Sequence, residues 1–141
     1  MSDLLASIEH NGNVAKVTSS GELVVAPLKY SESSYQSLAV DDQVYNFYTP
    51  RTEKQFIITG ILVFATKDVN DTTSTVIEIY EADSPSSATV SKVLLTFGMG
   101  KLTVISPTNL NILANSGAWI NARVDDNTVN LNILGYYIRS L

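Results

Sequence analysis

Four pairs of closely spaced carboxylates are the groups in this 141-residue chain that could carry acid–base chemistry. Glycoside hydrolysis, for example, needs two such groups held at a fixed separation across a cleft. The pairs are Asp41 with Asp42, Asp68 with Asp71, Glu78 with Glu81, and Asp125 with Asp126. All but the third lie in turn segments, where Asp commonly bonds the local backbone. Glu78 and Glu81 lie three apart on a predicted strand and should point to opposite faces, which makes them a poor pair.

The residue types argue against a catalytic nucleophile and against a metal site. The chain has no cysteine, and its one histidine, His10, lies near the N-terminus, so neither a Cys–His pair nor a His-based triad can form on the main body. Residues 68–71 and 125–127 offer the oxygen ligands that Ca²⁺ prefers, but neither loop has the spacing of an EF-hand. We therefore expect turn chemistry in both loops, no cofactor and no enzymatic activity, with a bound Ca²⁺ as the alternative.

Trp119 is the residue best suited to recognition of a sugar, because a flat ring can stack on a pyranose face. It belongs to a predicted strand at residues 118–124, where alternation places Trp119, Asn121 and Arg123 on one face. The polar neighbours indicate that this face is partly exposed. We interpret the three residues as part of an interface with another protein, and a glycan platform is the alternative.

Composition excludes several classes of partner. The net charge is −5, and the nine Lys and Arg residues are scattered singly, which argues against binding to nucleic acid. No apolar run approaches the roughly 20 residues needed to span a membrane, and the N-terminal residues do not resemble a signal peptide. The absence of cysteine fits assembly in a reducing cytoplasm. We expect a soluble protein that binds neither nucleic acid nor a membrane.

The elements that position these residues are organised around residues 54–66, KQFIITGILVFAT, the longest nearly uninterrupted apolar run. Its β-branched and aromatic residues favour a strand, and because both of its faces are apolar we expect it to be covered on both sides. We predict that it is the central strand of a β-sandwich. Gly60, midway along it, indicates a bulge or a close approach of another backbone.

Short strands and turns follow one another regularly from Tyr35 to the C-terminus. Strands are predicted at residues 36–40, 44–48, 55–66, 75–80, 90–97, 102–105, 118–124 and 129–138. We expect 102–105 to pair back on 90–97, and 129–138 to return beside 118–124 with its Asn130 face in solvent. Eight such strands predict an all-β, eight-stranded, jelly-roll-like antiparallel β-sandwich over residues 35–141, with an immunoglobulin-like sandwich as the alternative.

Residues 1–34 are predicted to form a separate N-terminal arm and β-hairpin. Residues 1–13 have a weak helical spacing that runs into Asn11-Gly12, a turn signal, so we expect a mobile or partner-anchored arm. Residues 13–18 and 22–26 alternate in polarity on either side of a Gly-containing loop and predict the hairpin. Such a small hairpin should need the main body or a neighbouring subunit for stability.

Four segments together resemble a family of small structural proteins from tailed bacteriophages. They are AKVTSSGELVVAPLKYS at 15–31, YNFYTPRTEKQFIITGI at 45–61, IYEADSP at 79–85 and GAWINARVDDNTVNLNILGYYI at 117–138. The resemblance implies a virion component. Jelly-roll proteins of this size are similar to capsid decoration or cement proteins, which typically form trimers at local threefold positions of the head.

The resemblance implies the partners and the location of the protein. The partners would be the major capsid protein and two further copies in a homotrimer, and the location would be the capsid surface of a virion assembled in the host bacterial cytoplasm. An alternative is a receptor- or carbohydrate-binding module of a tail or head appendage, with Trp119, Asn121 and Arg123 as its first candidate residues. A sugar-acting enzyme is the weakest alternative.

Overall fold

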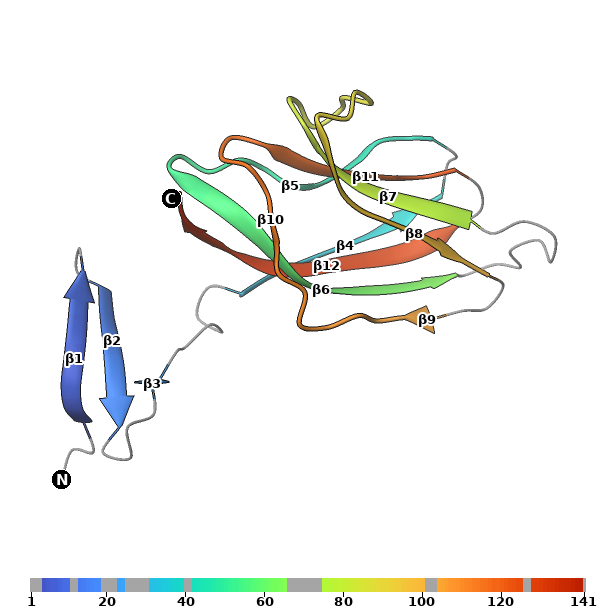
Figure 1. The fold of residues 1–141 in the computed structure, drawn as a ribbon. Coiled ribbons are helices and arrows are strands. Elements are labelled where there is room, and N and C mark those ends of the chain that lie inside the picture. The colour runs from blue at the N-terminus through green and yellow to red at the C-terminus, as the bar shows by residue number, and fades with distance from the viewer. Residues whose placement is uncertain are drawn as a thin grey trace. The chain divides into compact units, whose positions relative to one another are not determined.

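The computed structural model describes residues 4–10, 13–18, 23–24, 31–39, 42–65, 75–100, 104–125 and 128–140. Within these ranges every regular element is a β-strand (Figure 1). The described part of the chain therefore holds no helix long and apolar enough to cross a membrane. The chain forms two compact units, Met1–Tyr30 and Ser31–Leu141, and we call the second unit the body.

The N-terminal unit is a small antiparallel sheet. It contains β1 (Leu4–His10), β2 (Asn13–Thr18) and β3 (Leu23–Val24), in the order β1-β2-β3. The pairing of β2 with β3 confirms the predicted hairpin. The structure differs from the expected arm at β1, which pairs with β2 over most of its length, because a paired strand satisfies the backbone groups that a short helix would leave open.

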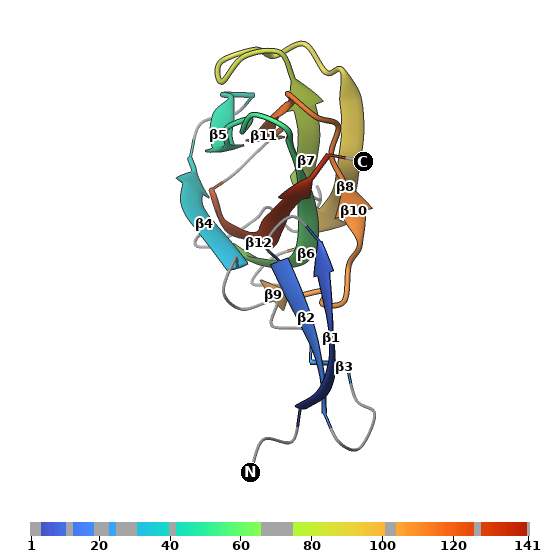
Figure 2. The same cartoon turned by 90° about the vertical axis from the view of Figure 1, so that its left-hand side faces the viewer.

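The body is a sandwich of two antiparallel sheets, seen as two stacked layers in Figures 1 and 2. We call the first, of order β10-β6-β12-β4 with β9 also on β6, the β6 sheet, and the second, of order β5-β11-β7-β8, the β7 sheet. The strands are β4 (Ser31–Leu38), β5 (Tyr45–Tyr48), β6 (Lys54–Ala65), β7 (Thr75–Ala82), β8 (Lys92–Met99), β9 (Val104–Ile105), β10 (Ile112–Leu113), β11 (Trp119–Val124) and β12 (Val129–Arg139).

The connections between strands confirm the jelly-roll-like sandwich. Strands that follow one another in sequence mostly cross from one sheet to the other, and β7 and β8 are the exception in which neighbours in sequence pair. The strand position at the edge of the β6 sheet is divided between β9 and β10, which both pair with β6. Two four-position sheets joined in this way are typical of a jelly roll, and the order differs from that of an immunoglobulin sandwich.

Two predicted pairings between neighbours in sequence are wrong. β9 pairs with β6 through Val63 and Ile105 and does not pair back on β8. β12 pairs with β4 and β6, while β11 pairs with β5 and β7 in the other sheet. Both errors have one cause: these connections cross the sandwich, so that each strand finds partners far away in sequence. β4 also begins at Ser31, so it extends across the boundary predicted at residue 34.

The central strand is β6, as predicted. It lies between β12 on one side and β9 and β10 on the other. The predicted bulge is confirmed, because the register against β12 shifts between Leu134, opposite Gly60, and Gly135, opposite Ile58. The expected cover on both faces is incomplete, since the side chain of Leu62 is 37% exposed on the outer face.

At Gly135, on β12, the backbone of β6 approaches more closely than at Gly60. A Cβ atom built there would overlap the carbonyl oxygen of Ile57 and lie 2.6 Å from the ring of Phe56, whereas a Cβ at Gly60 would meet Leu134 Cδ1 at 3.4 Å. Two neighbouring glycines therefore have different functions. Gly135 is required by packing, and Gly60 lies at the bulge.

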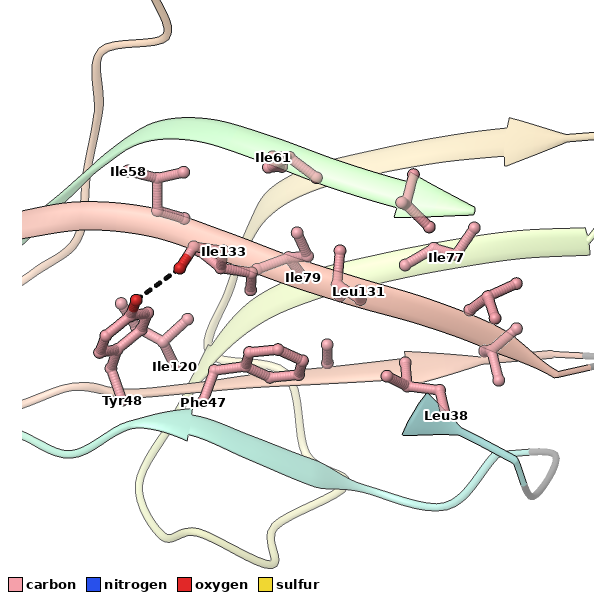
Figure 3. Packing of buried hydrophobic residues seen from close by; sticks show 14 of the residues in the cluster. Leu38, Phe47, Tyr48, Ile58, Ile61, Ile77, Ile79, Ile120, Leu131 and Ile133 are labelled. Carbon is pink, nitrogen blue, oxygen red and sulfur yellow. Dashed lines mark hydrogen bonds between the residues drawn. The ribbon is translucent and has the colours of Figure 1, made fainter. Parts of the chain in front are cut away.

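The core fills the space between the two sheets with Ile, Leu, Val and aromatic side chains (Figure 3). Tyr48 from β5 reaches across it, stacks on Phe56 with ring centroids 3.9 Å apart, and donates its hydroxyl hydrogen to the carbonyl of Ile133. Burial raises the pKa of Tyr48 well above its ordinary value, and the nearby Glu32 adds to the effect. This hydrogen bond links the two sheets through their shared interior.

Candidate functional site

The predicted site residues lie on β11, a central strand of the β7 sheet. Its inward-facing residues Ile120, Ala122 and Val124 are buried in the core, which places Trp119, Asn121 and Arg123 on the outer side of the sheet. The alternation read from the sequence is therefore confirmed. The exposure of the three residues differs, because a connecting segment covers part of this face.

The segment at residues 83–91, between β7 and β8, lies over the outer side of the β7 sheet (Figure 1). Beneath it Asn121 is fully buried, at 0% exposure. The amide nitrogen of Asn121 donates to the carbonyls of Ser84 and Ser87, 3.0 and 3.4 Å away, and its side-chain oxygen accepts from Asn46 at 2.9 Å. Asn121 thus fastens the segment to the sheet and offers no free group to a ligand.

Arg123 lies beside the same segment and is engaged on three sides. Its Nη2 lies 2.8 Å from Oε1 of Glu78, a buried oxygen without a hydrogen bond, so the guanidinium charge compensates it. Its Nη1 donates to the carbonyl of Ala88 at 3.3 Å, and the guanidinium stands 5.3 Å from the ring centroid of Tyr80. Burial raises the pKa of Tyr80, and the charge of Arg123 opposes part of that shift. These contacts describe a structural ion pair.

Trp119 remains partly exposed at the start of β11, opposite Ala82 on β7. Arg123 lies four positions further along the strand, a distance of about 13 Å. Asn121, which lies between them, is covered. The structure therefore places the three predicted residues on one face without joining them into a continuous platform, and Trp119 is the one whose ring a partner can reach.

A shallow hollow of about 430 Å³ opens beside Arg123. It is lined by Asp42, Val76, Glu78, Arg123 and Asp125. Two of its three carboxylates hold the chain in place: Asp125 accepts a hydrogen bond from the backbone nitrogen of Val76 at 2.7 Å, and Glu78 pairs with Arg123. The expected bond of Asp125 to the backbone of its own turn is thus not what the structure shows, because its carboxylate binds the backbone of β7, 49 residues away in sequence.

The calcium alternative falls largely outside the described residues. Residues 68–71 lie there entirely, and of residues 125–127 the structure describes Asp125 alone. Within the described ranges no three His, Cys, Asp or Glu side chains gather in a way that could hold a metal ion.

Glu81 has a role that the sequence did not indicate. Its side chain is 2% exposed and accepts hydrogen bonds from the backbone and side-chain nitrogens of Asn115, at 2.8 and 2.9 Å. The ammonium of Lys92 lies 3.7 Å from the same carboxylate. Glu81 therefore anchors the turn that leads into β11. The sequence around Glu81 does not indicate its partner Asn115, which lies 34 residues away. Glu78 and Glu81 point to different faces of the sheet, as predicted, since Glu78 lies opposite Arg123 and Glu81 lies opposite Ile120.

No family model and no curated protein sequence matches the chain. Among solved structures, it is similar to a chain in the acidic stable capsid structure of Helicobacter pylori bacteriophage KHP30, with a TM-score of 0.51 and 16% identity over 78% of this chain and 94% of that one. For a chain of the cyanophage Pam1 capsid asymmetric unit the TM-score is 0.38, with 16% identity over 75% of this chain and 84% of that one. For a chain from Bacillus endospore appendages, a family of disulfide-linked pili, the TM-score is 0.33, with 9% identity over 80% of this chain and 95% of that one.

The likeness to the KHP30 chain concerns the fold. At 16% identity it says that the same arrangement of strands occurs in a chain of that capsid, and it extends over nearly the whole of that chain. The other two matches have TM-scores too low to support an argument.

Proposed function

We propose that this protein is a non-enzymatic structural component of a bacteriophage virion and that it associates with the capsid shell. The observation that carries the proposal is the shared fold with a chain of the KHP30 capsid, over 94% of that chain. The sequence resemblance to small structural proteins of tailed phages supports it independently of the fold.

The finer proposal is a decoration or cement protein at the capsid surface. Its partners would be the major capsid protein and two further copies of itself in a homotrimer, rather than nucleic acid or a membrane. Each copy would bury uncharged surface across the joints between capsid subunits. Many weak contacts repeated over one shell would then act together through avidity and stabilise it.

The polar groups around β11 support a structural role for this region. Asn121 fastens the segment at residues 83–91, Glu81 anchors the turn before β11, and Arg123 is paired with Glu78. Groups used in this way hold a rigid scaffold, and rigid scaffolds suit proteins that act by association. Trp119, partly exposed at the end of this scaffold, is the residue of the predicted set that we propose for contact with a partner.

The proposal is tested by separating heads from tails of the phage that encodes the chain and by quantifying the protein in each fraction. We expect it in the head fraction. Its presence in the tail fraction alone would favour the receptor- or carbohydrate-binding alternative, and its absence from both fractions would overturn a role in the virion.

The stabilising role requires a separate experiment. Heads that lack the protein, from a phage with its gene deleted, are heated with and without added purified protein while release of DNA is measured. We expect the added protein to bind to saturation and to raise the temperature of release. Binding without any such rise would contradict a cement function.

A further inference from the structure

The carboxylate of Glu81 holds an amine and an amide together where β8 passes beside β10 (Figure 2). The Nζ of Lys92, the first residue of β8, lies 3.7 Å from Oε1 of Glu81. The side-chain nitrogen of Asn115 donates to Oε2 at 2.9 Å, and its backbone nitrogen donates to Oε1 at 2.8 Å. Nζ also donates to the carbonyl of Leu113 at 3.3 Å, on the segment that leads to Asn115. A primary amine and a carboxamide are thus gathered around one acid–base group.

The three side chains differ in their exposure to solvent. Glu81 is 2% exposed, whereas the side chain of Lys92 is 48% exposed and Asn115 lies at the surface. The carboxylate is therefore screened from bulk water, and the groups with which it can exchange protons are those that contact it. The long side chain of Lys92 can rotate about its own bonds toward the amide carbon of Asn115 without a change in the backbone.

Two other ion pairs in the described part of the chain use arginine. Arg51 lies 2.9 Å from Glu32, and Arg123 lies 2.8 Å from Glu78. A guanidinium stays protonated and does not act as a nucleophile, so those contacts are structural. The amine of a lysine becomes a nucleophile when it loses a proton. The contact of Lys92 is also the longer one, at 3.7 Å, which leaves its amine freer to move.

We propose that Lys92 and Asn115 become joined by an intramolecular isopeptide bond, with Glu81 as the acid–base catalyst. Glu81 takes a proton from the ammonium of Lys92, and the free Nζ attacks Cγ of Asn115 to form the Nζ–Cγ bond. The Cγ–Nδ2 bond then breaks. Nζ gives up two protons in all and Nδ2 gains two, so the nitrogen of the amide leaves as ammonium. Glu81 ends as the carboxylate that it was at the start, and the step needs no oxidant, reductant or further reactant.

Proximity is the main contribution of the fold to this step. An amine and a primary amide are unreactive toward each other in dilute solution, and reaction requires Nζ to approach Cγ to about 3–3.5 Å. The shared carboxylate keeps both groups at one place in every folded molecule, which raises their effective concentration. Because the bond forms once and ammonium is lost to the solvent, the step is not turnover and agrees with a protein that is not an enzyme.

The bond would connect the two sheets of the body at one edge. Lys92 begins the edge strand β8 of the β7 sheet, and Asn115 follows β10, which belongs to the β6 sheet. The chain has no cysteine, so a disulfide cannot supply such a link. The inference goes beyond the proposed function and does not depend on it, because a bond within one chain requires no partner.

Mass spectrometry of the purified full chain tests the inference. We expect an intact mass about 17 Da below that of the sequence, after allowance for removal of Met1, because one ammonia is lost. Tryptic digestion should leave the chain uncut after Lys92 and release residues 68–101 joined to residues 102–123. A protein with the full mass of its sequence would overturn the inference.

Three variants identify the groups that react. Lys92→Arg keeps a cation beside Glu81 but removes the nucleophile, so we expect the full sequence mass. Lys54→Arg, at an exposed position on β6, is the matched control and should keep the deficit. Glu81→Gln should have the full mass, and if it does not fold, Lys92→Arg decides because its side chain is half exposed.

Asn115 can also lose ammonia by closing a ring with its own backbone, and the peptide map separates this reaction from the isopeptide bond. Ring closure would place the deficit in residues 102–123 alone and would leave Lys92 open to trypsin. A deficit of that kind, or one that persists in Lys92→Arg, would overturn the inference.

Discussion

Single residues set how closely neighbouring strands of one sheet can pack, and Gly135, on β12 beside β6, is the clearest case. A side chain at this position has no room beside the Ile57 carbonyl and the Phe56 ring. The sequence predicted a bulge or close approach at Gly60, where β6 does bulge, but it gave no sign of Gly135. A glycine within a strand is visible in a sequence, but the backbone that approaches it comes from a distant segment.

Gly135→Ala is expected to destabilise the protein by about 2–3 kcal/mol, because overpacking forces the backbone or the Phe56 ring to move. Gly60→Ala is the matched control. Its Cβ would meet the flexible side chain of Leu134 at ordinary contact distance, so we expect a change within about 1 kcal/mol. Urea denaturation of the two variants makes the comparison, and equal effects would contradict this account of the packing.

Because the pKa of Tyr48 is raised in the folded state, we expect the protein to lose stability at alkaline pH. The pKa of Tyr48 in the folded state is raised above its ordinary value of 10.0, so the folded protein holds this proton more tightly than the unfolded chain does. The stabilisation is complete below pH 10 and is lost as the pH rises above it. We expect the unfolding free energy to fall there by up to about 1.4 kcal/mol per pH unit for each such tyrosine.

Tyr48→Phe should be less stable at neutral pH by about 1 kcal/mol, because the hydrogen bond to Ile133 is lost, and its stability should depend less on alkaline pH. Denaturation curves measured from about pH 8 to about pH 11 test both effects. Burial also raises the pKa of Tyr80 and Tyr137, so a smaller dependence should remain. If the unfolding free energy of Tyr48→Phe falls at alkaline pH as steeply as that of the wild type, then Tyr48 is not the source of the pH dependence.

Strands were predicted from the sequence more successfully than their partners. Alternation and turn residues identified β6, β7 and β11 nearly to their ends, because these signals are local. The pairing of β9 with β6 and the separation of β11 from β12 depend on connections that cross the sandwich, which local patterns do not encode. Alternation along β11 is a local signal, so it predicted the face on which Asn121 lies. It could not predict that Asn121 is buried, because the segment at residues 83–91 that covers it comes from elsewhere in the sequence.

The segment at residues 83–91 is held on the β7 sheet by Asn121, and this element can be tested as a unit. Asn121→Ala would leave the partly buried carbonyls of Ser84 and Ser87 and the amide of Asn46 without this partner. We expect a loss of about 2–3 kcal/mol in stability and faster proteolytic cleavage within the segment.

Asn132→Ala is the matched control. Asn132 lies on the β6 sheet, is partly exposed and accepts a hydrogen bond from Ser33 of the same sheet. It should lose less than about 1 kcal/mol and leave cleavage of the segment unchanged. If both variants are cleaved at the same rate, then Asn121 does not fasten the segment.

At the scale of the whole molecule, the body is a sandwich whose two outer faces differ. One is partly covered by its own chain and carries ion pairs, while the other exposes apolar residues without charge. The two outer faces therefore offer surfaces of different chemistry. The sequence resemblance and the likeness to the KHP30 capsid chain lead independently to the same proposal.

The number of copies in each virion tests the central claim most directly. Purified particles are digested and the protein is quantified by mass spectrometry against labelled standards, with the major capsid protein as the internal reference. A decoration protein is expected at hundreds of copies per particle, in fixed proportion to the capsid subunit. A handful of copies, or none, would contradict the account.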